Sequence, residues 1–262
     1  MSMAILDEEA FAKSVLVSGD IGTKPSATIC ILIKYHHKNG MDKHQIRDEI
    51  ETFMSEHYKD FNSVKWQKKL DKDVNKYSQD KYTLKKVQSV KVSENELQYI
   101  KKIGNIKLER LAFVLLVYCK IANELNPENN NWVRKSSSEL FKSSKITERT
   151  IEQQLTIKRL ADIGYVSFAK TVDSESIHIE FIDPLCDAEI EIVDMREFVL
   201  EYLGWKGDKI GVCEKCDKLF KQTVNNKKHC RECSKEINIK KTIENRKKKK
   251  LFEAEIVANA TD

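Results

Sequence analysis

Four of the seven cysteines fall within a stretch of twenty-one residues, Cys213–Cys233, where they form two Cys-x-x-Cys pairs. Cysteines at this spacing serve disulfide crosslinking, dithiol redox chemistry or metal binding. A thioredoxin-like redox site needs one pair at the start of a helix in a βαβ context, and no such context precedes Cys213. Two pairs separated by thirteen residues are typical of a tetrahedral zinc site. The spacing therefore predicts one Zn²⁺ ion bound by Cys213, Cys216, Cys230 and Cys233.

The rest of the chain bears on the choice between zinc and disulfides. The first twenty residues carry acids where a signal peptide carries basic residues. No apolar run approaches the roughly 18–20 residues that span a bilayer. We therefore expect a cytoplasmic protein that does not enter a membrane, in a reducing compartment where structural disulfides are rare. Because cysteine fills all four ligand positions, the zinc is expected to be structural. Four reduced cysteines in an unfolded tail are the alternative.

Positive charge is concentrated around these cysteines. Residues 205–250 contain sixteen Lys and Arg residues but only six Asp and Glu residues, a net charge of +10, whereas the whole chain carries +5. A basic segment of this kind is typical of phosphate binding in nucleic acids, and a solvated tail is the alternative. The predicted DNA contacts of this segment are Lys227, Lys228, Arg246, Lys247, Lys248, Lys249 and Lys250.

The elements that must position these residues can be read from the surrounding sequence. A hairpin carrying Phe220 is expected after the first cysteine pair, and residues 234–250 lack Pro and Gly, which predicts a helix after the second pair. This order resembles the treble-clef zinc fingers of DNA-binding proteins over about forty residues.

A second candidate DNA-binding unit lies upstream, in residues 136–168. The sequence predicts a short helix near 138–143, then a second helix that is capped by Thr147, runs to Ile163 and ends at Gly164. Residues 165–170 and 177–182 alternate as two strands. An apolar helix, 108–125, precedes them. Three helices followed by a two-stranded wing resemble the winged helix-turn-helix domain of bacterial and phage regulators and replication proteins.

That resemblance implies that the second helix of the helix-turn-helix reads DNA. Gln and Arg side chains can make bidentate contacts to adenine and guanine. The sequence departs from the family pattern because Ile151 and Leu155 lie on a different face from Ile157, Leu160 and Ile163. The predicted base-reading residues near the start and middle of the helix are Arg149, Thr150, Gln153, Gln154 and Lys158.

The N-terminal third has a similar order of elements. Helices are expected over 26–40, 41–57 with Asp42 as its cap, and 63–78, followed by two short strands within 81–93. This region is either a second winged helix or a plain helical interaction domain. The expected domains are an N-terminal segment 1–24, a helical domain 25–100, a winged helix-turn-helix domain 101–184, a connecting strand and helix 185–204, a zinc finger with its basic helix 205–250, and a tail 251–262.

The composition fits a mainly α protein with small β-hairpins, of the α+β class. One third of the 262 residues are charged, only three are proline, and the mean hydropathy is −0.53. Because no phosphate-binding glycine loop or nucleophile motif occurs, we do not expect an enzyme.

We therefore expect a sequence-specific protein that binds double-stranded DNA, with a transcription regulator of a low-GC bacterium or its phage as the leading hypothesis. The alternatives are a phage or plasmid replication initiator and a zinc-containing adaptor. RNA polymerase or replication proteins would be partners. The oligomeric state is open, a dimer included.

Overall fold

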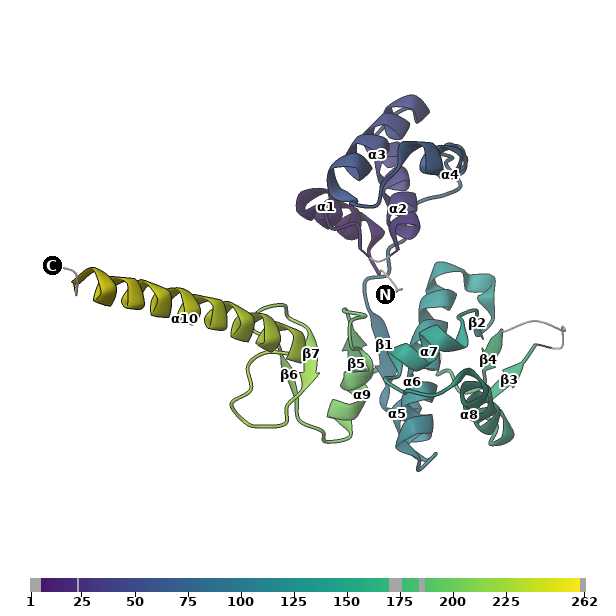
Figure 1. Ribbon diagram of the computed structural model, residues 1–262. Helices are drawn as coiled ribbons and strands as arrows, with labels where there is room; N and C mark the ends of the chain where they lie inside the picture. The colour runs from purple at the N-terminus through teal and green to yellow at the C-terminus, as the bar shows by residue number, and fades with distance from the viewer. Residues whose placement is uncertain (1–5, 23, 170–175, 184–186, 260–262) are drawn as a thin grey trace. The chain divides into compact units, whose positions relative to one another are not determined.

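The computed structural model describes residues 6–22, 24–169, 176–183 and 187–259, with side chains described up to Lys248. The chain divides into two compact units, Met1–Met195 and Arg196–Asp262. The described residues form ten α-helices and three small antiparallel sheets (Figure 1). This confirms the predicted α+β class with its helical majority.

The first unit begins with four helices that share one hydrophobic core. Helix α2 packs against the other three, and α3 also packs against α4. Apolar side chains at helical spacing, such as Ile46, Ile50 and Met54, are fully buried. The four helices are α1 Glu8–Ser18, α2 Pro25–Lys38, α3 Lys43–His57 and α4 Ser63–Tyr77.

Two helix starts in this group illustrate how local sequence sets the fold. Asp42 caps α3 as predicted, because its carboxylate accepts hydrogen bonds from the backbone N–H groups of His44 and Gln45. Helix α1 lies inside the segment 1–24, for which no helix was predicted. Asp7 caps it in the same way through the N–H of Ala10, at 2.8 Å.

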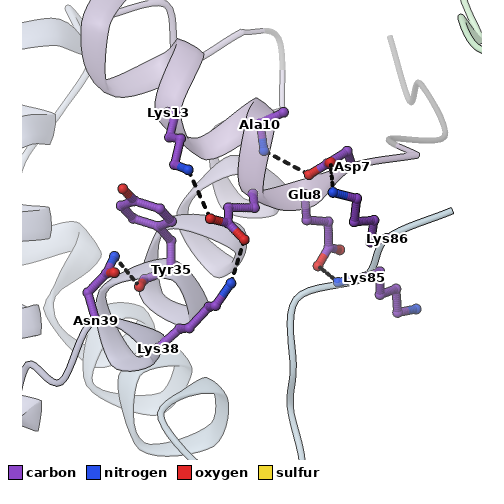
Figure 2. Close-up of polar contacts among 10 residues, drawn as sticks. Asp7, Glu8, Ala10, Lys13, Tyr35, Lys38, Asn39, Lys85 and Lys86 are labelled. Atoms are coloured by element: carbon purple, nitrogen blue, oxygen red, sulfur yellow. Dashed lines mark hydrogen bonds and ion pairs between the residues drawn. The ribbon is translucent and has the colours of Figure 1, made fainter. Parts of the chain in front are cut away.

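Acidic residues at the start of α1 tie it to a segment far along the chain (Figure 2). The Glu8 carboxylate accepts the backbone N–H of Lys85 at 2.9 Å, and Asp7 pairs with Lys86 at 3.2 Å. Glu8 also forms an ion pair with Lys34, whose side chain is only 9% exposed. The first turn of α1 therefore holds residues 85–86 against the four-helix core.

The two short strands predicted within 81–93 do not form a hairpin, so this prediction was wrong. Only β1 (Val90–Ser93) forms a strand there, and its antiparallel partner is β5 (Ala188–Ile192), about a hundred residues later. Ser93 ends the strand and caps helix α5 (Glu94–Lys101) through a capping box with Glu96.

Helix α6 (Ile106–Leu125) is the central helix of the rest of this unit. Nearly every residue from Leu111 to Cys119 is fully buried, and α6 packs against α5, β1 and the elements that follow it. Lys120 of α6 forms an ion pair with Glu96 at 2.7 Å, in which the Glu96 side chain is buried and that of Lys120 is 14% exposed. This pair links α6 to the junction of β1 and α5.

The segment after α6 forms a 3₁₀-helix, two α-helices and a three-stranded sheet. Strand β4 lies in the middle of this sheet and pairs with β2 on one side and β3 on the other. The structure thus confirms a strand within each of the predicted segments 165–170 and 177–182, but burial alternates only in β4, because Ser167 and Phe168 of β3 are both exposed; residues 170–175 lie outside the described part. The elements are the 3₁₀-helix η1 Pro127–Asn129, β2 Trp132–Val133, α7 Ser137–Ser143, α8 Thr150–Asp162, β3 Val166–Phe168 and β4 Ile177–Ile179.

The second unit holds the cysteine pairs. A short helix packs against a hairpin, and the long helix α10 leaves this hairpin as one continuous rod (Figure 1). Helix α10 runs to Asn259, beyond Lys250, where the basic helix was expected to end. The elements are α9 Val199–Trp205, β6 Ile210–Val212, β7 Leu219–Lys221 and α10 Arg231–Asn259.

Candidate metal centre and outward helix face

The four cysteines of the second unit converge on one point. Their sulfur atoms all lie within 4.8 Å of one another, and the Sγ atoms of Cys216 and Cys230 are 3.9 Å apart. Four thiolates around a tetrahedral Zn²⁺ with bonds of about 2.3 Å have sulfurs about 3.8 Å apart. The arrangement therefore fits the donor set that holds a single metal ion, as the spacing predicted.

Short local structures bring the two pairs together. Cys213 and Cys216 lie between β6 and β7, where Asp217 adopts a left-handed conformation, with φ at 57°, and donates its N–H to the carbonyl of Cys213. Cys230 and Cys233 lie at the start of α10. Phe220, the predicted hairpin residue, is buried beside the four sulfurs. One aromatic ring and the four cysteines thus form a small buried cluster between the hairpin and the start of α10.

The environment of the cysteines favours a thiolate at Cys213. Although burial opposes ionisation there, hydrogen bonds from the backbone of Cys230, Lys215 and Cys216 lower the pKa of Cys213 to about 5. Burial and the neighbouring cysteines raise the pKa of Cys233 to about 12. A cation at the centre would supply the charge that keeps all four sulfurs ionised.

Lysines surround the cysteines, and most of them are engaged with other groups. Lys215 pairs with Glu236, and Lys218 with Glu232 at 2.7 Å. Lys228 pairs with Glu214 at 3.1 Å, and Lys227 lies over the Phe220 ring at 5.4 Å from its centre. The ion pairs of Lys215 and Lys218 join the loop of the first cysteine pair to α10, so these lysines help to hold the two cysteine pairs together.

Helix α10 is exposed on all sides over most of its described length. Every described residue from Asn238 to Lys248 is exposed, including Ile239 and Ile243. Lys248 pairs with Glu244 at 3.0 Å, one turn earlier, while Arg246 and Lys247 are solvent-exposed. The side chains of Lys249 and Lys250 lie outside the described residues. The basic charge is therefore displayed along a free-standing helix.

In the first unit, α8 begins later than predicted. Thr147 does not cap it, and the N-cap is Arg149. Glu152 fixes this start, because its carboxylate accepts the backbone N–H of Arg149 at 3.1 Å. Glu148 accepts a hydrogen bond from the hydroxyl of Thr156 at 2.9 Å and pairs with Lys107. The turn before α8 is thus locked by Glu148. The predicted C-terminal glycine, Gly164, follows the helix with φ at 80°.

One face of α8 packs into the core and the opposite face is open. Thr156, Ile157 and Leu160 are buried, whereas Ile151 is 73% and Leu155 52% exposed. The two apolar residues that did not fit the core stripe therefore point outward. Their helical spacing predicts this different face, but residue type alone did not mark them as candidate site residues.

The predicted base-reading residues fall in different environments. Arg149, Thr150, Gln154 and Lys158 are exposed. Gln153 is half-buried, and its side-chain amide donates to the backbone carbonyl of Glu148 at 2.9 Å. Four of the five residues are thus open to a partner, while Gln153 is engaged with its own turn.

A cavity of about 460 Å³ lies beside α1 and α2. Basic side chains line it, but they are balanced by acids. Lys34 pairs with Glu8, and Lys38 with Glu9. His37 lies 3.2 Å from Asp80. These cations therefore pair with acids where α1, α2 and the segment after α4 pack together, and they need no ligand in the cavity to balance their charge.

Comparison of the chain with protein-family models, curated proteins and solved structures finds no match. Among the helices of the described residues, none combines the length and apolar character that a bilayer span requires.

Proposed function

We propose that this chain binds double-stranded DNA in a sequence-dependent way and acts as a transcription regulator. The observation that carries the proposal is the open face of α8, which displays Arg149, Gln154 and Lys158 while the opposite face is buried. Arg and Gln can make two hydrogen bonds to a base edge in the major groove, which is wide enough to admit an α-helix.

The neighbours of α8 support this role. The order α6, β2, α7, α8, β3 and β4, with β2 pairing to the hairpin of β3 and β4, resembles a winged helix-turn-helix domain. In that arrangement the second helix of the helix-turn-helix enters the major groove. The described residues place no ion-pair partner on the side chains of Arg149 and Lys158, so these cations are free to meet phosphates or bases.

The second unit would add affinity rather than selectivity. We propose that its four cysteines bind Zn²⁺, because cysteine-only sites with this spacing are typical of structural zinc. The metal would hold the hairpin against the start of α10. The exposed basic residues of α10 would then contact phosphates, which stabilise binding to any sequence in a salt-dependent way.

Selection from a random duplex pool, followed by affinity measurements over a range of salt concentrations, tests the proposal. We expect an enriched sequence, and we expect its preference over random duplex to shrink when Gln154→Ala is introduced. Equal affinity for all duplexes, or no binding to duplex DNA, would refute the proposed function.

The salt dependence of binding distinguishes the proposed contribution of the second unit from that of the first. Log affinity falls as log salt rises, and each phosphate neutralised adds about 0.9 to the magnitude of this slope. The double variant Arg246→Gln/Lys247→Gln should reduce the magnitude of the slope by up to about 1.8 and leave the sequence preference unchanged. Lys24→Gln/Lys59→Gln removes the same charge from exposed sites just before α2 and just after α3 and is the matched control. An altered sequence preference in the α10 variant would contradict the assignment.

A replication initiator would share these properties, and the position of its binding site distinguishes it from a regulator. Footprinting on the DNA that encodes the chain and its neighbours should protect a single promoter if it is a regulator. Protection of a tandem array of repeats would support an initiator.

A further inference from the structure

The outward face of α8 carries two apolar side chains that no core requires. Ile151 and Leu155 are 73% and 52% exposed, and they lie one helical turn apart. The inner residues Ile157 and Leu160 already pack the helix against the rest of its unit. Exposed isoleucine and leucine at the centre of a helix face therefore call for a partner outside this unit.

Charge indicates what kind of partner fits this face. Lys158 and Arg159 lie on the next turn of the same helix, Arg149 lies at its start, and all three are exposed. The described residues place no carboxylate within ion-pair distance of these three cations. A polyanion would match the positive charge of these three side chains. Two side chains also provide far less apolar area than the roughly 800 Å² that each partner buries in a typical protein interface.

We infer that Ile151 and Leu155 recognise the methyl groups of thymines in the major groove of DNA. This inference rests on the proposed function, because it assigns a base preference to the helix that was proposed to enter the groove. Thymine is the base that presents an apolar group in the major groove. Against any other base, an apolar side chain would cover hydrogen-bonding groups and leave them without partners.

The spacing of the two residues predicts the spacing of the thymines. Residues four apart on an α-helix are separated by a rise of about 6 Å. Successive base pairs are separated by about 3.4 Å. Two side chains on one face of a helix that lies along the groove therefore reach positions about two base steps apart. The target site should contain two thymines with this separation, next to the bases that Gln154 and Arg149 contact.

Replacing thymine by deoxyuridine tests this inference, because it removes only the methyl group. The sequence selected by the wild-type chain is resynthesised with deoxyuridine at one thymine at a time, and affinities are measured at one fixed salt concentration. Loss of one buried methyl should weaken wild-type binding by about fourfold. Two thymines, about two steps apart, should show this effect.

Variants of the protein then assign each methyl to a side chain. Ile151→Ala should abolish the sensitivity to deoxyuridine at one of the two thymines, and Leu155→Ala at the other. Val17→Ala is the matched control, because Val17 is a 90% exposed apolar residue on α1. This variant should keep both sensitivities. All three positions are exposed, so the substitutions leave the packed cores intact.

The possible failures are distinguishable. Selective binding that is indifferent to every deoxyuridine would refute the inference and leave the proposed function standing. Absence of any sequence preference in the wild-type chain would refute the proposed function, and this inference with it. A dimer in sedimentation experiments that Ile151→Ala or Leu155→Ala dissociates would also overturn the inference, because the face would then bind a second copy of the chain.

Discussion

The buried ion pair between Glu96 and Lys120 offers the sharpest test of how the first unit is held together. The Glu96 side chain is only 1% exposed and that of Lys120 is 14% exposed. Glu96 also accepts the backbone N–H groups of Ser93 at 2.9 Å and Asp183 at 3.0 Å. Glu96→Gln keeps the size of the side chain and removes its charge, so the ion pair with Lys120 would be lost.

The expected cost follows from burial. Removing one partner of a buried pair typically destabilises a protein by about 3–5 kcal/mol, because the remaining charge stays out of water. Glu9 provides the contrast. It pairs with both Lys13 and Lys38 but is 34% exposed, and exposed pairs contribute little. If the number of ion pairs decided stability, Glu9→Gln would be the more damaging change. We expect the reverse.

We would follow urea unfolding by the fluorescence of Trp132. This residue lies in β2, which packs against α6, the helix that carries Lys120. The measurement uses a background in which Trp66 and Trp205 are replaced by phenylalanine. Glu96→Gln should lower the free energy of unfolding far more than Glu9→Gln. The double variant Glu96→Gln/Lys120→Met should recover part of the loss, since the charges of both partners are then removed. A loss below about 1 kcal/mol for Glu96→Gln, the size of a surface pair, would refute the reasoning.

Two further predictions concern the metal and pH. The purified chain should contain about one zinc per molecule by elemental analysis, and Cys213→Ser/Cys230→Ser should remove it; full occupancy in that variant would rule out the proposed ligands. Although burial opposes ionisation of Glu148, its contacts with Lys107 and Thr156 lower its pKa below the ordinary value of 4.5. Its contribution to stability is therefore present above pH 4.5 and lost as the pH falls through the lowered pKa. Denaturation curves between pH 6 and about 3 should show this loss in the wild type and a smaller one in Glu148→Gln; identical pH profiles would contradict the assignment.

Local sequence signals were sufficient to predict the elements that are stabilised by local contacts. The cap at Asp42, the glycine after α8 and the cysteine spacing each involve residues close together in the chain. The cap and the glycine are fixed by contacts within one helical turn, and the cysteine pairs have a spacing that is itself typical of a metal site, so the sequence alone predicts them. Helix α5 could have been found by the same logic, because Ser93 and Glu96 form the Ser-x-x-Glu capping box.

Non-local pairing explains the main error. Strand β1 alternates as a strand should, but nothing in residues 81–93 indicates that its partner is β5. A hairpin within residues 81–93 was therefore the pairing that local sequence favoured. The predicted start of α8 was wrong for a different reason. Thr147 is a favourable cap by residue type, yet Glu152 reaches back to the N–H of Arg149 and moves the start of the helix by two residues.

Residues that conflict with the pattern of their own helix are the most informative ones for function. In α8 the core stripe requires Ile157 and Leu160, and a soluble surface would favour polar residues at 151 and 155. The helix instead carries Ile151 and Leu155 there, each more than half exposed. Sequences usually agree with their fold at every level, and they depart from it where another demand applies. We propose that the demand at this position is for an apolar contact beside cations, which DNA would meet with the methyl group of thymine and with its phosphates.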